Sequence, residues 1–189
     1  MFNLNLPNFL TLVRIMLVPV VVVALLDRTP GGDLLAAIVF AVASLTDLID
    51  GYLARSRDWV TNFGKLMDPV ADKLLVVAAL LALVSLHRLD GWVAMVIIAR
   101  EFAVTVTRLA VSQSGVVIPA NRWGKAKTVM QVATVFLLIA VTGHPLWLTL
   151  LVDLTVAVTV LSGVDYFFGL RRRLSEARLP GETSSGGAG

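Results

Sequence analysis

The sequence predicts an all-α integral membrane protein with six transmembrane helices and both termini in the cytoplasm. Three observations predict this fold class: the composition, six long apolar segments, and an uneven distribution of Lys and Arg among the connecting loops. Of the 189 residues, 57% are hydrophobic and only 15% are charged, and the mean hydropathy is +0.84. An ordinary soluble domain is about 25% charged. A soluble chain of this length could not bury so much apolar surface.

Six segments are long and apolar enough to cross a bilayer, which takes about 20 mostly apolar residues in a helix. They are residues 7–27, 34–54, 68–86, 92–111, 125–141 and 146–170. Turn-forming sequences such as DRTPGGD, RLDG and TGHP separate them. We therefore expect residues 1–170 to form one six-helix domain. Residues 171–189 form a cytoplasmic tail that begins basic and ends in a flexible Gly/Ser run.

Lys and Arg concentrate in the loops on one side of the predicted membrane. That side receives Arg55, Arg57, Lys65, Arg122, Lys125, Lys127, Arg171, Arg172, Arg173 and Arg178, and the other side receives Arg28 and Arg88. Cytoplasmic loops carry an excess of Lys and Arg, so the richer side faces the cytoplasm of a multi-pass cell-membrane protein. The pI of about 9.7 follows from this bias and from anionic headgroups. We accordingly expect membrane lipids, and no nucleic acid, as partners.

Four aspartates flank the cytoplasmic connection between the second and third predicted helices. Asp47 and Asp50 are three residues apart, and Asp68 and Asp72 are four apart. Either spacing places two side chains on one helix face, so two antiparallel neighbours can bring four carboxylates together. Carboxylate oxygens suit Mg²⁺ or Mn²⁺. Four of them are enough for two ions bridged by a phosphate.

The residues around these aspartates fit phosphate chemistry. Gly51 and Ala54 leave the second helix thin enough for a ligand to approach its backbone, and Gly64 does the same beyond the loop. The planar guanidinium of Arg55 can donate two hydrogen bonds to one phosphate. An acid at a helix start, such as Asp68, can also be a simple cap. The complete set of acids, glycines and arginine favours a metal and phosphate site instead.

The pattern D-x2-D-G-x2-A-R-x8-G-x3-D-x3-D from Asp47 to Asp72 resembles, without a gap, the motif of the CDP-alcohol phosphotransferases. These are six-helix membrane enzymes that make phospholipids. The stretches NLPNFLTLVRIMLVP, IIAREFAVTVTR and GKAKTVMQ resemble the branch of that family that makes phosphatidylglycerol phosphate. Together these pieces cover about residues 3–131.

The resemblance implies a role for each matching residue. Asp47, Asp50, Asp68 and Asp72 would hold two divalent cations, Mg²⁺ or Mn²⁺, and Asp72 would also be the general base. The residues expected to bind the CDP-lipid are Asn8, Thr11, Gly51, Arg55, Thr61 and Gly64. The acceptor alcohol would attack the phosphorus that carries diacylglycerol, and CMP would leave. The resemblance also implies a homodimer.

Cationic residues on the fourth and fifth predicted helices indicate which acceptor alcohol the protein uses. Arg100 and Arg108 are eight residues apart, roughly two turns, and so share a face; Glu101 is expected to hold one of them in place. A cluster of Arg100, Arg108 and Lys125 fits the phosphate of sn-glycerol 3-phosphate, although Lys125 and Lys127 also fit the loop charge bias.

Two classes of alternative function stay open. Within the family, the acceptor could be phosphatidylglycerol, as in cardiolipin synthesis, or another alcohol such as serine or inositol phosphate. These alternatives differ in the acceptor pocket and share the aspartates. A divalent-cation transporter is the alternative from another class. It is disfavoured because the aspartates lie at the cytoplasmic edge and no inverted repeat of their pattern occurs.

Overall fold

The computed structural model describes residues 6–27, 30–57, 62–113 and 122–177, and in 6–8, 47–57, 62–69, 72, 112–113, 122–125 and 172–177 it describes the backbone alone. Six helices occupy these ranges: α1 (Leu6–Leu26), α2 (Gly32–Arg57), α3 (Asn62–Ser85), α4 (Gly91–Gln113), α5 (Arg122–Ala140) and α6 (Leu146–Ala177). The described ranges contain no strand. The prediction of an all-α protein with six helices is confirmed to this extent.

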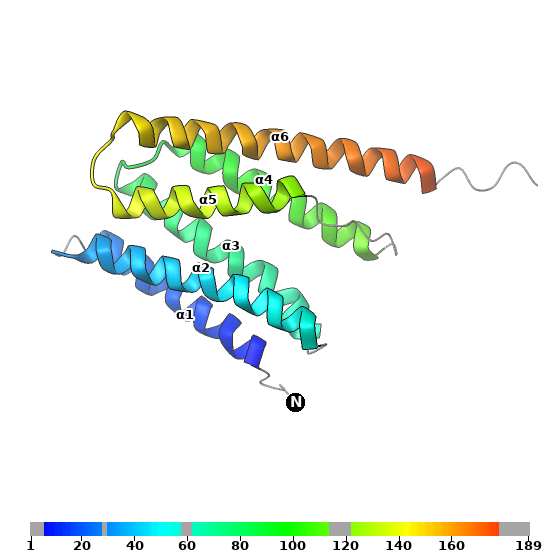
Figure 1. Ribbon diagram of the computed structural model, residues 1–189, viewed down its shortest axis with the longest axis horizontal. Helices are drawn as coiled ribbons and strands as arrows, with labels where there is room; N and C mark the ends of the chain where they lie inside the picture. The colour runs from blue at the N-terminus through cyan, green and yellow to red at the C-terminus, as the bar shows by residue number, and fades with distance from the viewer. Residues whose placement is uncertain (1–5, 28–29, 58–61, 114–121, 178–189) are drawn as a thin grey trace, which may run out of the picture.

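The helices run alternately up and down, so their connections gather at two ends (Figure 1). We call the end with the α1–α2, α3–α4 and α5–α6 connections the turn end, and the end where α6 finishes the tail end. Helix α1 packs against α2 and α3, whereas α5 packs against α2, α3 and α6. Helix α4 packs against α3 and α6. Helix α5 therefore connects α2 and α3 with α6.

All six helices continue beyond the predicted apolar segments toward the tail end, α3 and α6 by the most residues. Helix α2 reaches Arg57, α3 begins at Asn62, and α6 reaches Ala177. An apolar-run criterion stops at the first charged residues, whereas helical backbone hydrogen bonds continue past them. Asp68 consequently lies in the second turn of α3 and not at its start. The alternative that it only caps a helix is therefore wrong.

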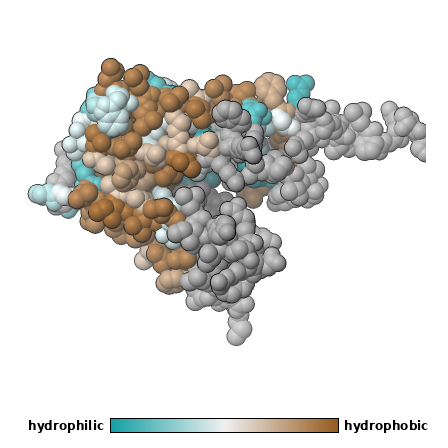
Figure 2. Space-filling view, in the orientation of Figure 1, coloured by the Kyte–Doolittle hydropathy of each residue, from teal (hydrophilic) through white to brown (hydrophobic). Residues whose placement is uncertain are grey.

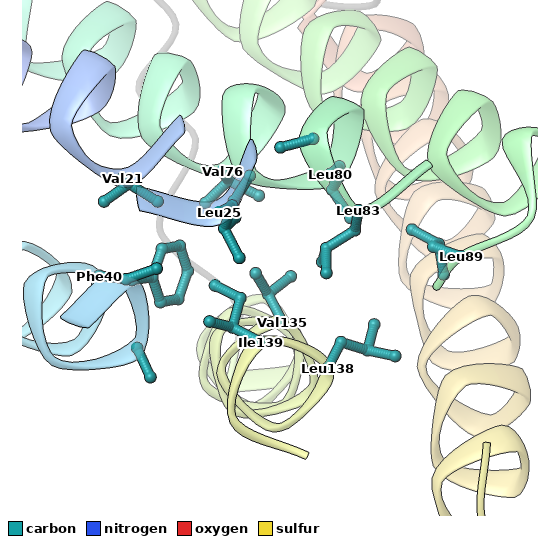
Figure 3. Packing of buried hydrophobic residues seen from close by; sticks show 14 of the residues in the cluster. Val21, Leu25, Phe40, Val76, Leu80, Leu83, Leu89, Val135, Leu138 and Ile139 are labelled. Carbon is teal, nitrogen blue, oxygen red and sulfur yellow. The ribbon is translucent and has the colours of Figure 1, made fainter. Parts of the chain in front are cut away.

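The hydrophobic core lies where α1, α2, α3 and α5 meet. Figure 3 shows Phe40 of α2 beside Val21 and Leu25 of α1, with Val135 and Ile139 of α5 close by. The face of α2 that carries Phe40 otherwise consists of small buried residues, namely Ala36, Ala37 and Ala43. Small residues let membrane helices approach closely, which increases packing between their backbones.

Large apolar side chains cover much of the outer surface. Met16 of α1, Leu161 of α6 and Phe168 of α6 are each about two-thirds exposed. Figure 2 shows that hydrophobic residues dominate the described part of one face. Monomeric soluble proteins rarely expose contiguous apolar patches larger than a few hundred Å². This surface is typical of a protein that contacts lipid.

Within the described residues, two helical stretches are long and apolar enough to cross a membrane, Phe9–Leu26 and Leu146–Arg171. Shorter apolar stretches occupy Gly32–Thr46, Lys73–Ser85 and Ala126–Ala140. The two long apolar stretches support a membrane protein.

Candidate active site

The four aspartates predicted to bind metal lie on two antiparallel helices toward the tail end. Asp47 is ten residues before the end of α2, and Asp72 is ten residues after the start of α3. Asp50 and Asp68 are seven and six residues from the same helix ends. The backbone thus pairs the aspartates at two matching levels of neighbouring helices. Their side chains lie outside the described residues.

The residues predicted to bind the CDP-lipid surround this position along the backbone. Gly51 and Arg55 follow the first two aspartates in α2, and Gly64 lies in the first turn of α3 and not in a loop. Their side chains, like that of Asn8 in α1, are outside the described part, and Thr61 lies wholly outside it. Thr11, one turn beyond Asn8, is buried. Helix α1 packs against both aspartate-bearing helices, so it can line the same site.

Three cationic side chains surround Glu101 of α4. Lys127 of α5 donates a hydrogen bond to Glu101 Oε1. Arg100 Nη1 donates to the same oxygen at 3.1 Å, and Lys73 Nζ of α3 lies 3.7 Å from Glu101 Oε2. Lys127 is only 2% exposed, and the side chains of Lys73, Arg100 and Glu101 are 15–17% exposed. We call these four residues the Glu101 cluster.

The Glu101 cluster brings cationic side chains from three helices, α3, α4 and α5, to one carboxylate. Ionised groups removed from water are stable only when they are paired and hydrogen-bonded. Cations gathered at one place raise the local positive potential, which favours an anionic ligand. Lys73 directly follows Asp72 along α3. The cluster consequently lies next to the predicted metal site.

Helix α6 supplies the remaining contacts of the two predicted acceptor arginines. Arg100 Nη2 donates a hydrogen bond to Ser162 Oγ at 2.9 Å. The guanidinium carbon of Arg108 lies 5.9 Å from the centre of the Tyr166 ring, a cation–π contact. Both arginines therefore face the same helix, as their spacing predicts, but Arg108 is exposed whereas Arg100 is largely enclosed.

Two members of the Glu101 cluster are absent from the predicted acceptor site. The sequence predicts Lys125 at this site, whose side chain lies outside the described residues, and predicts no role for Lys73. The helical pattern does contain a signal for Lys127, because Gln131, Thr134 and Val135 follow it on one buried face. Lys73 gives no such signal, since its contact with Glu101 depends on how α3 and α4 pack.

Comparison with known proteins identifies the family. A model of the CDP-alcohol phosphatidyltransferase family matches residues 4–161. The chain is 44% identical over 183 residues to the CDP-diacylglycerol–glycerol-3-phosphate 3-phosphatidyltransferase of Bacillus subtilis (strain 168), covering 86% of this chain and 93% of that protein. It is 42% identical over 167 residues to a probable phosphatidylglycerophosphate synthase of Mycobacterium tuberculosis (strain ATCC 25618 / H37Rv), covering 86% and 79%. The chain belongs to the CDP-alcohol phosphatidyltransferase family.

Proposed function

We propose that this protein transfers the phosphatidyl group of CDP-diacylglycerol to sn-glycerol 3-phosphate and releases CMP. The observation that carries the proposal is the Glu101 cluster, which gathers three enclosed cationic side chains beside the aspartate motif of the family. The names of the relatives from Bacillus subtilis and Mycobacterium tuberculosis support the same reaction.

The charge of the Glu101 cluster favours a phosphate monoester as the acceptor. The cluster gathers three cations, and a phosphate monoester carries a charge of about −1.5 to −2 at pH 7. Phosphatidylglycerol is a diester with one negative charge, and glycerol has none. Either of these acceptors would be attracted to the three cations less strongly than a phosphate monoester. The cardiolipin alternative is therefore disfavoured.

The aspartates fit a pair of divalent cations. Asp47, Asp50, Asp68 and Asp72 provide hard oxygen ligands at matching levels of two antiparallel helices, which is a donor set suited to Mg²⁺ or Mn²⁺. When bound, these ions would neutralise the pyrophosphate charge of the CDP-lipid.

The other residues of the motif act on the two substrates. In our proposal Asn8, Thr11, Gly51, Arg55, Thr61 and Gly64 bind the CDP-lipid. Arg100, with Arg108 and Lys125, holds the acceptor phosphate, and Lys73 and Lys127 add to its field. Asp72 accepts the proton of the acceptor hydroxyl while the oxygen attacks the phosphorus that carries diacylglycerol. The phosphorus–oxygen bond to CMP then breaks.

We further propose that all six helices span the cell membrane, with both termini and the aspartates on the cytoplasmic side. The Lys and Arg bias and the alternating helix directions support this topology. Cysteines placed at Arg57, Val116 and Ser184 should react with a thiol reagent only from the cytoplasm, and cysteines at Gly31 and Asp90 only from outside. An outward Val116 would contradict the topology. We also expect a homodimer, which cross-linking in detergent would detect.

The direct test of the reaction is an acceptor panel. Purified protein is supplied with CDP-diacylglycerol and with sn-glycerol 3-phosphate, glycerol, serine, inositol phosphate or phosphatidylglycerol, and CMP release is measured. We expect rapid release with sn-glycerol 3-phosphate and poor release with glycerol. Preference for phosphatidylglycerol would support the cardiolipin alternative. Absence of release with every acceptor, together with divalent-ion flux in vesicles, would support a transporter.

Arg100→Ala tests the acceptor site in the same assay. The variant removes a charged donor that is nearly enclosed, and charge-assisted contacts to phosphate are stronger than neutral ones. We expect the KM for sn-glycerol 3-phosphate to rise by about tenfold or more, with a smaller change in the KM for CDP-diacylglycerol. Equal increases in both KM values would contradict this role.

A further inference from the structure

One face of α6 carries polar and small residues in the middle part of the helix. Thr155, Thr159, Ser162, Gly163 and Tyr166 recur at intervals of three and four residues, so they share a face. Thr155 bonds to Thr134 of α5 at 2.8 Å, Ser162 bonds to Arg100 of α4, and Tyr166 lies beside Arg108 of α4. This face therefore points into the bundle. Its last part, from Ser162 onward, lies beyond the family match at residues 4–161.

Ser162 fixes the direction of the hydrogen bond that holds Arg100. Its hydroxyl donates to the carbonyl oxygen of Thr159 at 3.0 Å, which commits its only hydrogen. The oxygen can then only accept from Arg100 Nη2, at 2.9 Å. On the other side of the guanidinium, Nη1 is held by Glu101 Oε1. Two partners on two segments thus define where the guanidinium lies.

Gly163 provides the space that the Arg100 side chain occupies. A Cβ atom at Gly163 would lie 3.2 Å from Arg100 Cγ and 3.7 Å from Arg100 Nε. The first distance is shorter than an ordinary carbon–carbon contact of about 3.5–4.0 Å, so Arg100 would have to move. The affected atom is in the middle of the side chain, and its movement would carry the guanidinium with it. Gly169 on the same helix has nothing within 4 Å of its would-be Cβ.

We infer that Ser162 and Gly163 are positioning residues that set the place of the Arg100 guanidinium and thereby determine the affinity for the phosphorylated acceptor. This inference rests on the proposed function, in which Arg100 holds the acceptor phosphate. Oriented binding groups lose much of their effect when displaced by about 1 Å. A specificity determinant of the acceptor site then lies on α6, the helix with no motif of its own.

The test compares Gly163→Ala with Gly169→Ala in purified protein. We expect Gly163→Ala to raise the KM for sn-glycerol 3-phosphate by about tenfold, with the KM for CDP-diacylglycerol and the Tm nearly unchanged. Gly169→Ala should change none of the three. Ser162→Ala should act like Gly163→Ala, and Ser162→Thr, which keeps the hydroxyl, should recover most of the affinity.

A double-variant experiment separates positioning from general packing. In an Arg100→Ala background, Gly163→Ala and Ser162→Ala should have no further effect on the KM for sn-glycerol 3-phosphate, because they act through the missing side chain. Unchanged KM in Gly163→Ala, or equal rises in both KM values, would overturn the inference while wild-type turnover still supports the proposed function. Absence of wild-type turnover with sn-glycerol 3-phosphate would instead overturn the proposed function and the inference with it.

Discussion

Arg88 and Asp33 form a closed ion pair at the turn end. Arg88 Nη1 donates to Asp33 Oδ1 at 2.9 Å, and Arg88 Nη2 donates to Asp33 Oδ2 at 2.7 Å. Nη1 also approaches the carbonyl oxygen of Ile139 at 3.4 Å. The pair thereby ties the start of α2 and the α3–α4 connection to the end of α5. One positive charge meets one negative charge, with both carboxylate oxygens occupied.

The Glu101 cluster, nearer the tail end, differs in both charge and hydrogen bonding. One carboxylate there serves three cations, and Arg100 Nε is buried without a hydrogen-bond partner among the described residues. A buried donor without a partner costs about 1–3 kcal/mol. An ion pair that only held helices together would not require a buried donor without a partner. The difference fits our proposal, in which the turn end contributes stability and the Glu101 cluster binds an anion.

The largest expected effect is loss of activity on removing an aspartate from the predicted metal site. Asp47→Asn, Asp50→Asn and Asp68→Asn should each lower kcat by orders of magnitude, because lost metal binding removes several kcal/mol of charge stabilisation, at ~1.4 kcal/mol per tenfold. The Tm in detergent should change little. Asp33→Asn is the matched control, which should lower the Tm and leave kcat nearly unchanged.

Metal removal examines the same site without a substitution. EDTA should abolish CMP release, and added Mg²⁺ or Mn²⁺ should restore it. Full activity in EDTA would rule out the two-cation proposal. A loss of kcat in Asp33→Asn as large as in Asp47→Asn would remove the functional contrast between the two ends.

The second-largest effect is expected for Glu101→Gln. This variant should be less stable than wild type and should be stabilised more by an added anion. The substitution keeps the size of the side chain but removes the carboxylate that all three cations of the cluster contact. Removing one partner of a buried ion pair costs about 3–5 kcal/mol, so the Tm should fall clearly. The rise in Tm on adding sn-glycerol 3-phosphate should be larger than in wild type, because the dianion replaces part of the missing charge. An unchanged Tm would contradict the central role of Glu101.

The sequence predicted the helices well because apolar runs of membrane length leave few alternatives. It also identified the aspartate motif, since the spacing along two helices is local information. The limits of α2, α3 and α6 were less accurate, because the charged ends of a helix satisfy its backbone without being apolar. Lys73 and Ser162 could not be predicted as neighbours of Glu101 and Arg100. Those contacts join helices distant in the sequence, and only their packing brings them together.

A smaller effect is expected at the turn end for Arg88→Ala. The side chains of Arg88 and Asp33 are 21% and 29% exposed, so water partly compensates the lost pair. Loss of two charge-assisted hydrogen bonds should lower the free energy of unfolding by about 2 kcal/mol, measurable as a lower Tm. Both KM values should stay as in wild type when activity is normalised to folded protein. A selective change in the KM for sn-glycerol 3-phosphate would show that the two ends are coupled.

The smallest effect is expected from His87, which closes α3 at the turn end in a left-handed conformation. Its φ is 58°, whereas the other two connections at this end use Gly31 at 89° and Gly143 at 109°. The amide of His87 donates to Val84 O at 3.0 Å, and the amide of Arg88 donates to Leu83 O at 2.9 Å. This is the Schellman arrangement, which normally places glycine at the position of His87.

His87→Gly should therefore stabilise the protein. The left-handed conformation costs a residue with a Cβ roughly 1–2 kcal/mol, and the greater freedom of glycine in the unfolded chain offsets about 0.4–1 kcal/mol of that gain. The exposed imidazole has little packing to lose, so the net stabilisation should be about 0–1.6 kcal/mol, visible as a small rise in Tm. His87→Ala removes the side chain but keeps the Cβ, and it should give no rise. Equal stabilisation by both variants would show that the imidazole, and not the backbone, is the source of the strain. Because the turn end is remote from the Glu101 cluster, kcat and both KM values should be the same in all three proteins.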